Sequence, residues 1–212
     1  MKELRDIRRA DVDEASRRAA RDVAQRAARD GLLDIGYAFT DSPFGPLLVA
    51  ATRRGLVRLA YPDEDPNDAL SDLAERISPR VLESAAMTDE VRRELEEYFA
   101  GRRTTFSTAV DLGLRTGFTK RVLRATARIP FGSVSTYRDV ARRAGNERAS
   151  RAAGNALGSN PVPVVVPCHR VVHVDGGLGG YTGGMERKEF LLQLEGALPD
   201  PGHAPARPRR RR

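Results

Sequence analysis

The sequence predicts an α+β protein in which a small mixed domain precedes a mostly helical one. Three short strand-like runs and two helical patterns come before residue 101, whereas a helix-turn-helix pattern follows residue 112. Charge divides the chain in the same way. Residues 34–112 hold 9 basic and 15 acidic side chains, and residues 113–197 hold 13 basic and 6 acidic ones. This asymmetry predicts that the second half meets a polyanion, most plausibly nucleic acid, and a solvated basic face without a partner is the alternative.

Composition sets the broad class. The chain has 212 residues, of which 40% are hydrophobic and 31% charged, so it is long enough to bury a core. No apolar stretch approaches the roughly 20 residues that span a bilayer, and the N-terminus is charged where a signal peptide would be apolar. We therefore expect no membrane partner and a cytoplasmic location. One cysteine excludes an internal disulfide, and the three histidines lack the spacing of a structural zinc site, so we expect no metal and no cofactor.

The N-terminal elements follow from local patterns. Residues 1–33 are rich in Arg and Ala with few large apolar side chains, which predicts an extension that is helical or mobile. Turn-forming residues separate the next runs, which indicates a small antiparallel sheet. The predicted strands cover residues 35–40, 46–51 and 55–61, and the predicted helices cover residues 67–77 and 89–100.

The second half begins after a connector at residues 102–115. Apolar residues at helical spacing predict a helix from Phe118 to Ile129. The run Thr136–Asp139 is typical of a capping box that opens a short helix, and a glycine-containing turn then leads to a second helix at 147–157. This pair has the length of a helix-turn-helix, although such hairpins are also common packing units.

The second helix of the pair carries small residues and arginine. Ser150, Ala152 and Gly154 surround Arg151, where a helix meant for core packing would present Leu, Ile or Val. Small side chains allow a close approach, and an arginine among them suits insertion into the minor groove of DNA. The alternative interpretation is an Ala-rich helix that packs tightly on a neighbouring element.

The only cysteine, Cys168, follows the apolar run 163–166, which predicts a buried strand. A thiolate is a strong nucleophile, so this position indicates chemistry. A lone cysteine is also often a small buried hydrophobic residue. Because adjacent residues of a strand point to opposite sides, we expect His169 not to touch the sulfur directly.

A glycine-rich stretch and a final helix complete the pattern. Residues 175–184 contain six glycines, but they lack the spacing and the lysine of a phosphate-binding loop and do not form a dinucleotide fingerprint. A helix is predicted over 186–194, and it ends at Glu195-Gly196. Residues 198–212 form a basic tail that we expect to be disordered, with weak nonspecific DNA contact as the alternative.

These motifs together resemble one family. The segment Pro167–Val171 (Pro-Cys-His-Arg-Val), Asn-Pro-Val-Pro at 160–163, Gly-Tyr-Thr-Gly-Gly at 180–184 and the Glu-Gly pair resemble the O6-alkylguanine-DNA alkyltransferases, the methylated-DNA-protein-cysteine methyltransferases. The resemblance implies a ribonuclease-H-like domain at 34–111 and a winged helix-turn-helix alkyltransferase domain at 112–197.

The resemblance also implies the chemistry. Cys168 would accept the alkyl group from O6-alkylguanine in a single irreversible transfer, without cofactor or turnover. His169 would reach the sulfur through a water and be oriented by Glu195, Asn160 would hydrogen-bond the site, and Tyr137 would donate to guanine N3. Because free Cys has a pKa near 8.5, the site must favour the thiolate.

The same resemblance assigns the DNA contacts. Arg151 would enter through the minor groove and fill the stack vacated by the flipped base, and Tyr137 would assist rotation of the nucleotide. The remaining members of the implied interface are Ser150, Ala152 and Gly154 on the second helix of the helix-turn-helix and Pro163, Val171, Tyr181 and Thr182 around the base. The implied partner is duplex DNA that contains O6-alkylguanine, bound by a monomer; activity on O4-alkylthymine and the range of adducts stay open.

Three alternatives keep some of these features and drop others. A lesion-binding protein that recruits other repair factors would lack the cysteine, so Cys168 argues against it. A transcription regulator that senses alkylation would need a further effector domain, which the sequence does not suggest. A cysteine hydrolase would need a base paired directly with the thiol.

Overall fold

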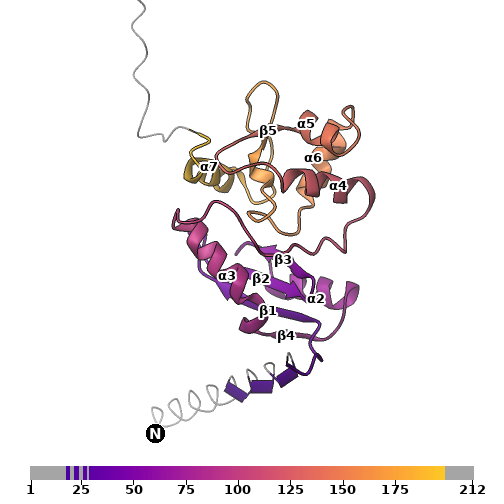
Figure 1. Cartoon of the computed structure of the whole chain (residues 1–212), viewed down its shortest axis with the longest axis vertical. Helices are drawn as coiled ribbons and strands as arrows, with labels where there is room; N and C mark the ends of the chain where they lie inside the picture. The colour runs from indigo at the N-terminus through magenta and orange to yellow at the C-terminus, as the bar shows by residue number, and fades with distance from the viewer. Residues whose placement is uncertain (1–17, 20–21, 24–25, 28, 199–212) are drawn as a thin grey trace, which may run out of the picture. The chain divides into compact units, whose positions relative to one another are not determined.

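The computed structural model describes residues 18–19, 22–23, 26–27 and 29–198, which group into two compact units (Figure 1). The first unit contains residues up to 97 and residues 106–114, and the second contains residues 98–105 and those from 115 onward. Most of the predicted N-terminal extension and all of the predicted tail except Leu198 lie outside the described residues. None of the helices in the described part of the chain combines the length and the apolar character that crossing a membrane requires.

A four-stranded sheet forms the first unit, with strand order β3-β2-β1-β4. Antiparallel pairing joins β1 (Ile35–Thr40) to β2 (Leu47–Thr52) and β2 to β3 (Gly55–Ala60), which confirms the small antiparallel sheet that the alternating runs predict. The short strand β4 (Val81–Glu83) pairs in parallel with β1 and was not predicted. Three residues give too short a pattern for recognition, so only pairing with β1 defines this strand.

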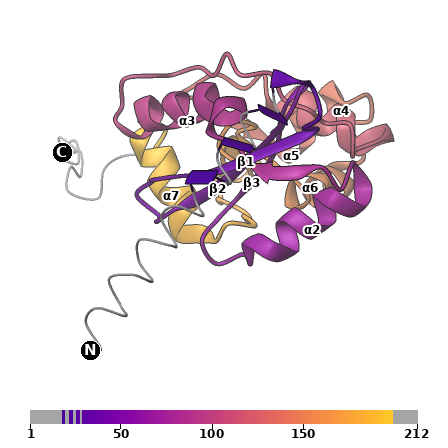
Figure 2. The ribbon, with the colours of Figure 1, turned by 90° about the horizontal axis from the view of Figure 1, so that it is seen from below.

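Two helices cover opposite faces of this sheet (Figure 2). Helix α2 (Pro66–Arg76) begins at Asp65, whose carboxylate accepts from the backbone N–H of Asn67 at 2.8 Å. Its buried Leu73 packs against Ile35 of β1. The next residue of β1, Gly36, approaches helix α3 (Ala85–Phe99), because a Cβ at Gly36 would lie 2.7 Å from Met87. Since successive strand residues face opposite sides, the two helices enclose the sheet.

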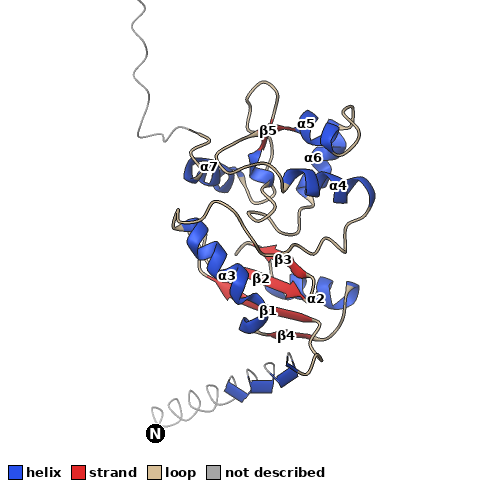
Figure 3. Ribbon diagram, in the orientation of Figure 1, coloured by secondary structure: helices blue, strands red, loops and turns tan. Residues whose placement is uncertain are grey.

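The second unit is mostly helical (Figure 3). It contains α4 (Gly117–Thr126), α5 (Tyr137–Arg143), α6 (Ser150–Gly158) and α7 (Met185–Leu194), together with the two-residue strands β5 (Ser135–Thr136) and β6 (Val171–Val172), which pair in parallel. Thus each helix that the sequence predicts in this half is present, with ends displaced by a few residues. The short strands were not predicted.

Helices α5 and α6 form the expected helix-turn-helix. The hydroxyl of Thr136 accepts from the backbone N–H of Asp139 at 3.0 Å, and its side chain also contacts the Asp139 carboxylate at 2.8 Å, as the capping sequence predicts. Gly145, with a φ of 94°, makes the turn to α6 in a backbone conformation that favours glycine. Residues 173–184, named here the glycine-rich loop, connect β6 to α7.

The predicted strand at 163–166 is wrong. These residues form turns, and Val166 N–H donates to Val162 O at 2.9 Å, before the 3₁₀ helix η1 (Cys168–Arg170) begins. Prolines at 161, 163 and 167 lack the N–H groups that a strand ladder requires, which explains the difference. The run is buried in either conformation, so its hydrophobicity does not distinguish the two. The expectation that Cys168 and His169 point apart therefore rested on the wrong backbone geometry.

Candidate active site

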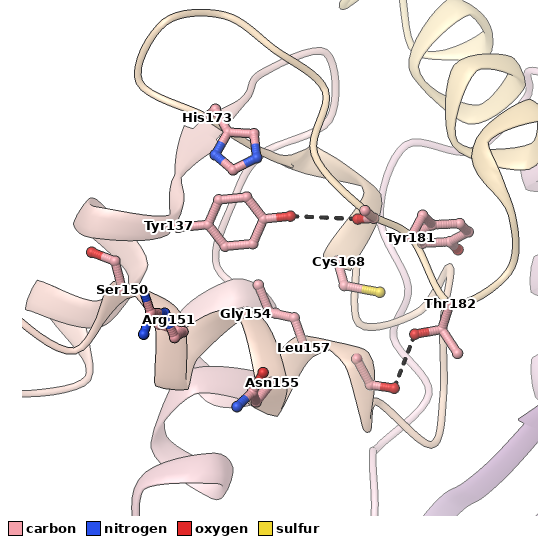
Figure 4. Close-up of a pocket in the computed structure, with 12 residues that line it drawn as sticks. Tyr137, Ser150, Arg151, Gly154, Asn155, Leu157, Cys168, His173, Tyr181 and Thr182 are labelled. Carbon is pink, nitrogen blue, oxygen red and sulfur yellow. Dashed lines mark hydrogen bonds between the residues drawn. The ribbon is translucent and has the colours of Figure 1, made fainter.

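Cys168 lies in the wall of a cavity of about 620 Å³ (Figure 4). The start of η1 places its sulfur there, while helix α6, the start of α5 and the glycine-rich loop provide other parts of the wall. Seven of the residues predicted from the sequence come together around this space: Tyr137, Ser150, Arg151, Gly154, Cys168, Tyr181 and Thr182. The cavity therefore combines the candidate nucleophile with the arginine of the candidate DNA-binding helix.

Asn160 holds the sulfur of Cys168. Its side-chain N–H group donates to Cys168 Sγ at 3.1 Å and to Val166 O at 2.8 Å, while its oxygen accepts from Val162 N–H at 3.2 Å. One amide thus braces the whole proline-rich turn against the sulfur. Burial raises the pKa of the Cys168 thiol to about 11, although the Asn160 hydrogen bond and the Lys188 charge act in the opposite direction. The resting group is therefore a protonated thiol, contrary to the expectation that the site favours the thiolate, and it needs a base to become a nucleophile.

His169, the residue after Cys168 in η1, forms a buried pair with Glu195. Both side chains are inaccessible to solvent, and His169 Nε2 lies 2.9 Å from Glu195 Oε1. A carboxylate accepts, so this contact assigns the ring proton to Nε2 and leaves a lone pair on Nδ1. Among the described residues, no group hydrogen-bonds Nδ1. Burial lowers the pKa of His169 despite the adjacent carboxylate, which favours a neutral ring able to accept a proton.

Sequence reasoning missed two partners of Glu195. Arg170 donates to both carboxylate oxygens at 2.8 Å and to Ile129 O at 2.6 Å, and the Tyr98 hydroxyl donates to Glu195 Oε1 at 2.6 Å. Burial raises the pKa of Glu195, but the hydrogen bonds from His169 and Arg170 outweigh it and lower this pKa to about 2. Glu195 is therefore ionised at neutral pH. Arg170 lies inside the motif already identified, whereas no local signal connects Tyr98 with a glutamate 97 positions away.

A buried lysine was also missed. Lys188 of α7 is fully buried and donates to Val171 O at 2.7 Å and to Leu178 O of the glycine-rich loop. Burial lowers its pKa to about 8, and a negative Cys168 would raise it. The spacing of Lys188 with Leu191 and Leu192 is that of a helix face, and this pattern could have identified the lysine as buried.

Some predicted residues lie away from the cavity wall. Pro163 and the side chain of Val171 are buried, and Ala152 is exposed on α6. His169, Glu195 and Asn160 also do not line the cavity, but they connect to Cys168 or to each other as described above. Five residues that the sequence did not indicate complete the wall: Asn155, Leu157, Gly158, His173 and Gly180. Within the described part of the chain, no cluster of three or more His, Cys, Asp or Glu side chains could hold a metal ion.

Both parts of the chain match described protein families. Residues 117–197 match the family "6-O-methylguanine DNA methyltransferase, DNA binding domain", and residues 35–112 match "6-O-methylguanine DNA methyltransferase, ribonuclease-like domain". Cys168, His169 and Glu195 fall within the first match, together with the helix-turn-helix.

Individual relatives cover most of the chain. The methylated-DNA–protein-cysteine methyltransferase of Methanosarcina acetivorans is 39% identical over 162 residues, 76% of this chain and 98% of the relative. The constitutive enzyme of the same name from Bacillus subtilis is 36% identical over 75% of this chain and 94% of its own length. Among solved structures, Mycobacterium tuberculosis OGT in complex with DNA has a TM-score of 0.66 and 35% identity, covering 76% of this chain and 93% of that one.

Proposed function

Because this chain belongs to the 6-O-methylguanine DNA methyltransferase family and repairs alkylated DNA by direct reversal, we propose that Cys168 is the residue that receives the alkyl group. The observation that carries this proposal is the position of the sulfur: Cys168 lines the cavity, and the next residue, His169, forms a buried pair with Glu195. Cys168 is also the only cysteine of the chain, so no other thiol competes for the role.

The proposed reaction is one displacement. The thiol proton passes to His169 Nδ1 through a water molecule, and the resulting thiolate attacks the carbon attached to guanine O6. A carbon–sulfur bond forms, the carbon–oxygen bond breaks, and its electron pair stays with guanine. The Tyr137 hydroxyl supplies a proton at guanine N3, and the resulting phenolate regains a proton from the His169 imidazolium through solvent, so one proton moves from the thiol side to the base overall. The thioether does not hydrolyse, and each molecule reacts once.

The electrostatics of the site support these roles. Glu195 is ionised and fixed by Arg170, so it holds the His169 tautomer whose Nδ1 accepts a proton. Burial raises the pKa of Tyr137, and a negative Cys168 raises it further, which keeps the phenol a hydrogen-bond donor. The buried Lys188 contributes positive charge when the thiolate forms. Thus burial disfavours the thiolate in the resting protein, while Asn160 and Lys188 stabilise the thiolate when it forms.

DNA is the partner of the protein, and we propose that residues 112–197 bind it through the minor groove. Arg151 lies in the cavity wall on α6, next to small residues that permit a close approach, which supports its role in filling the stack after base flipping. O6 of a stacked guanine is out of reach of a buried sulfur, so the nucleotide must rotate out at a cost of a few kcal/mol. The cavity volume of about 620 Å³ offers room for an extruded base.

We also propose that the protein acts as a monomer in the cytoplasm. Every residue of the proposed reaction comes from one chain, so the chemistry requires no second copy. Sedimentation of the protein alone and with a lesion-containing duplex measures its oligomeric state, and a protein found only as a dimer would contradict the monomer proposal. Cell fractionation followed by detection with an antibody measures the location, which we expect to be the cytoplasm.

Mapping the product peptide tests the proposal. The full-length protein is incubated with a duplex that contains one O6-methylguanine, digested, and analysed by mass spectrometry. We expect one methyl group per chain, on Cys168, and unmodified guanine in the duplex. The Cys168→Ser variant should bind the same duplex without repairing it. Tight lesion binding by the wild type with an unmodified Cys168 would instead identify a lesion-binding protein that recruits other factors.

A further inference from the structure

His173 lines the cavity but has no part in the proposed reaction. It is the first residue of the glycine-rich loop, and its side chain is exposed to solvent. Its ring lies against the ring of Tyr137, with centroids 5.1 Å apart and planes inclined by 44° (Figure 4). Aromatic pairs at this separation attract each other beyond simple burial.

Helix α6 lies on the other side of the Tyr137 ring, where Gly154 leaves room for about one methyl group. A Cβ placed on Gly154 would lie 3.7 Å from Tyr137 Cε1, which is ordinary van der Waals distance. His173 and Gly154 appear on opposite sides of the ring in Figure 4. The hydroxyl of Tyr137 has a long contact of 3.4 Å with Gly180 O, so hydrogen bonding alone fixes the ring weakly. The ring contact with His173 therefore adds a restraint on the orientation of Tyr137 beside α6.

The backbone of the glycine-rich loop closes around the same pair. Gly179 has a φ of 70°, and a Cβ at this position would lie 2.7 Å from Tyr137 Oη and 3.1 Å from His173 Nε2. No side chain fits there without moving one of the rings. Lys188 of α7 anchors the loop by donating to Leu178 O, and within the loop His173 N–H donates to Gly177 O at 2.7 Å.

We propose that His173 is a positioning residue that holds the Tyr137 ring against helix α6 for rotation of the nucleotide out of the duplex. The inference rests on the proposed function, since it specifies how one group of that site is kept in place. His173 touches no reacting atom in this account and acts through Tyr137 alone. Its loss should therefore slow the repair of duplex DNA while Cys168 stays reactive.

A double-mutant cycle on Tyr137 and His173 tests this coupling. The loss of one aromatic pair predicts that His173→Ala slows repair of an O6-methylguanine duplex by about three- to tenfold. His173→Phe keeps a ring at the position and should restore the rate to within about twofold of the wild type. In a Tyr137→Ala background, His173→Ala should cause no further loss. Val174→Ala, at an exposed neighbouring position that does not line the cavity, serves as the matched control.

Two kinetic results would overturn the inference. A loss of the same size in the Tyr137→Ala background would mean that His173 acts on DNA directly. Equal losses for His173→Ala and His173→Phe would mean that ring packing is irrelevant. An NMR measurement on the free protein separates this inference from the proposed function: the Tyr137 ring signals should shift in His173→Ala but not in Val174→Ala. Unchanged signals would refute the positioning role of His173, whether or not Cys168 proved to be the acceptor.

Discussion

The buried interior beside Cys168 does not line the cavity, and it differs from the mouth of the cavity in how its side chains are held. In the interior, His169, Glu195 and Arg170 are buried and linked by charge-assisted hydrogen bonds of 2.8–2.9 Å. At the mouth, Tyr137 has one long hydrogen bond and Arg151 is exposed on α6. Under the proposed function this difference predicts a division of labour, in which the interior activates the thiol for any alkylguanine and Arg151 at the mouth matters only when the base must leave a duplex.

Removal of the proposed base should give the largest effect. His169→Gln keeps a hydrogen-bonding side chain beside Glu195 but cannot accept the thiol proton. General-base catalysis contributes roughly 10²- to 10⁴-fold, so we expect a loss of this size in single-turnover transfer to Cys168. The loss should be similar for an O6-methylguanine duplex and for the free base O6-benzylguanine. A loss confined to the duplex would place His169 functionally with the mouth.

Acid should remove the stability that the ionised Glu195 contributes to the interior. The pKa of Glu195 is lowered from its ordinary value of 4.5 to about 2 in the folded protein. The resulting stability is present above pH 4.5 and is lost as the pH falls toward 2, by roughly 3 kcal/mol in the free energy of unfolding. Denaturant unfolding of the wild type at pH 5 and at pH 2.5 measures the fall.

The control for this decrease in the free energy of unfolding is the Glu195→Gln variant, measured by denaturant unfolding at the same two pH values. Its decline between the two pH values should be smaller, because the other carboxylates are unchanged and only Glu195 is missing. Circular dichroism at pH 7 first establishes that the variant is folded, since Arg170 loses its buried partner. Identical declines for both proteins would show that Glu195 does not provide this acid-labile stability.

Arg151 provides the corresponding test at the mouth. Arg151→Ala should slow repair of the duplex by about tenfold or more, because unstacking a base costs a few kcal/mol that the arginine offsets. Reaction with free O6-benzylguanine should stay within about twofold, as no base needs to be flipped. Arg148→Ala removes an exposed arginine just before α6 that does not line the cavity, and it should affect both substrates much less. Equal slowing of both substrates by Arg151→Ala would contradict its proposed role.

Thr182→Val should have the smallest effect. The hydroxyl of Thr182 donates to Gly158 O at 2.9 Å and so ties the glycine-rich loop to the end of α6. The resemblance gives the substrate contact to the backbone N–H, which valine retains. We expect a loss of about 1 kcal/mol in the free energy of unfolding and transfer rates within about threefold of the wild type. A loss of activity as large as that of His169→Gln would show that the hydroxyl itself takes part.

The strands and helices that the sequence predicts correctly are those with a local pattern. The strands at 35–40, 47–52 and 55–60 alternate or are bounded by turn residues, and the Thr136 cap lies three residues from its partner. The turn before Cys168 was misread because its valines are buried and prolines alone signal the difference. Three consecutive residues of β4 carry no period, and only the pairing with β1 makes them a strand.

In the candidate site, too, the sequence predicts the residues that belong to local motifs and not those whose contacts depend on the fold. The motifs identify Cys168, Asn160 and the cavity-lining residues of α6, which the fold brings together. The contact of Tyr98 with Glu195 spans 97 positions, and a single sequence holds no record of such a contact. The helix-face spacing of Lys188 indicates its burial but not the backbone carbonyls to which it donates. The sequence presents His173 only as one of three histidines without metal-site spacing, because its packing on Tyr137 depends on how the glycine-rich loop folds.

The double variant His169→Gln/Arg151→Ala tests the division between interior and mouth most directly. Single-turnover transfer to Cys168 is measured for this variant and both single variants, with duplex and with free base. If the two regions act independently, the losses multiply on the duplex, and the double variant equals His169→Gln on the free base. A further loss on the free base, or no further loss on the duplex, would contradict the division.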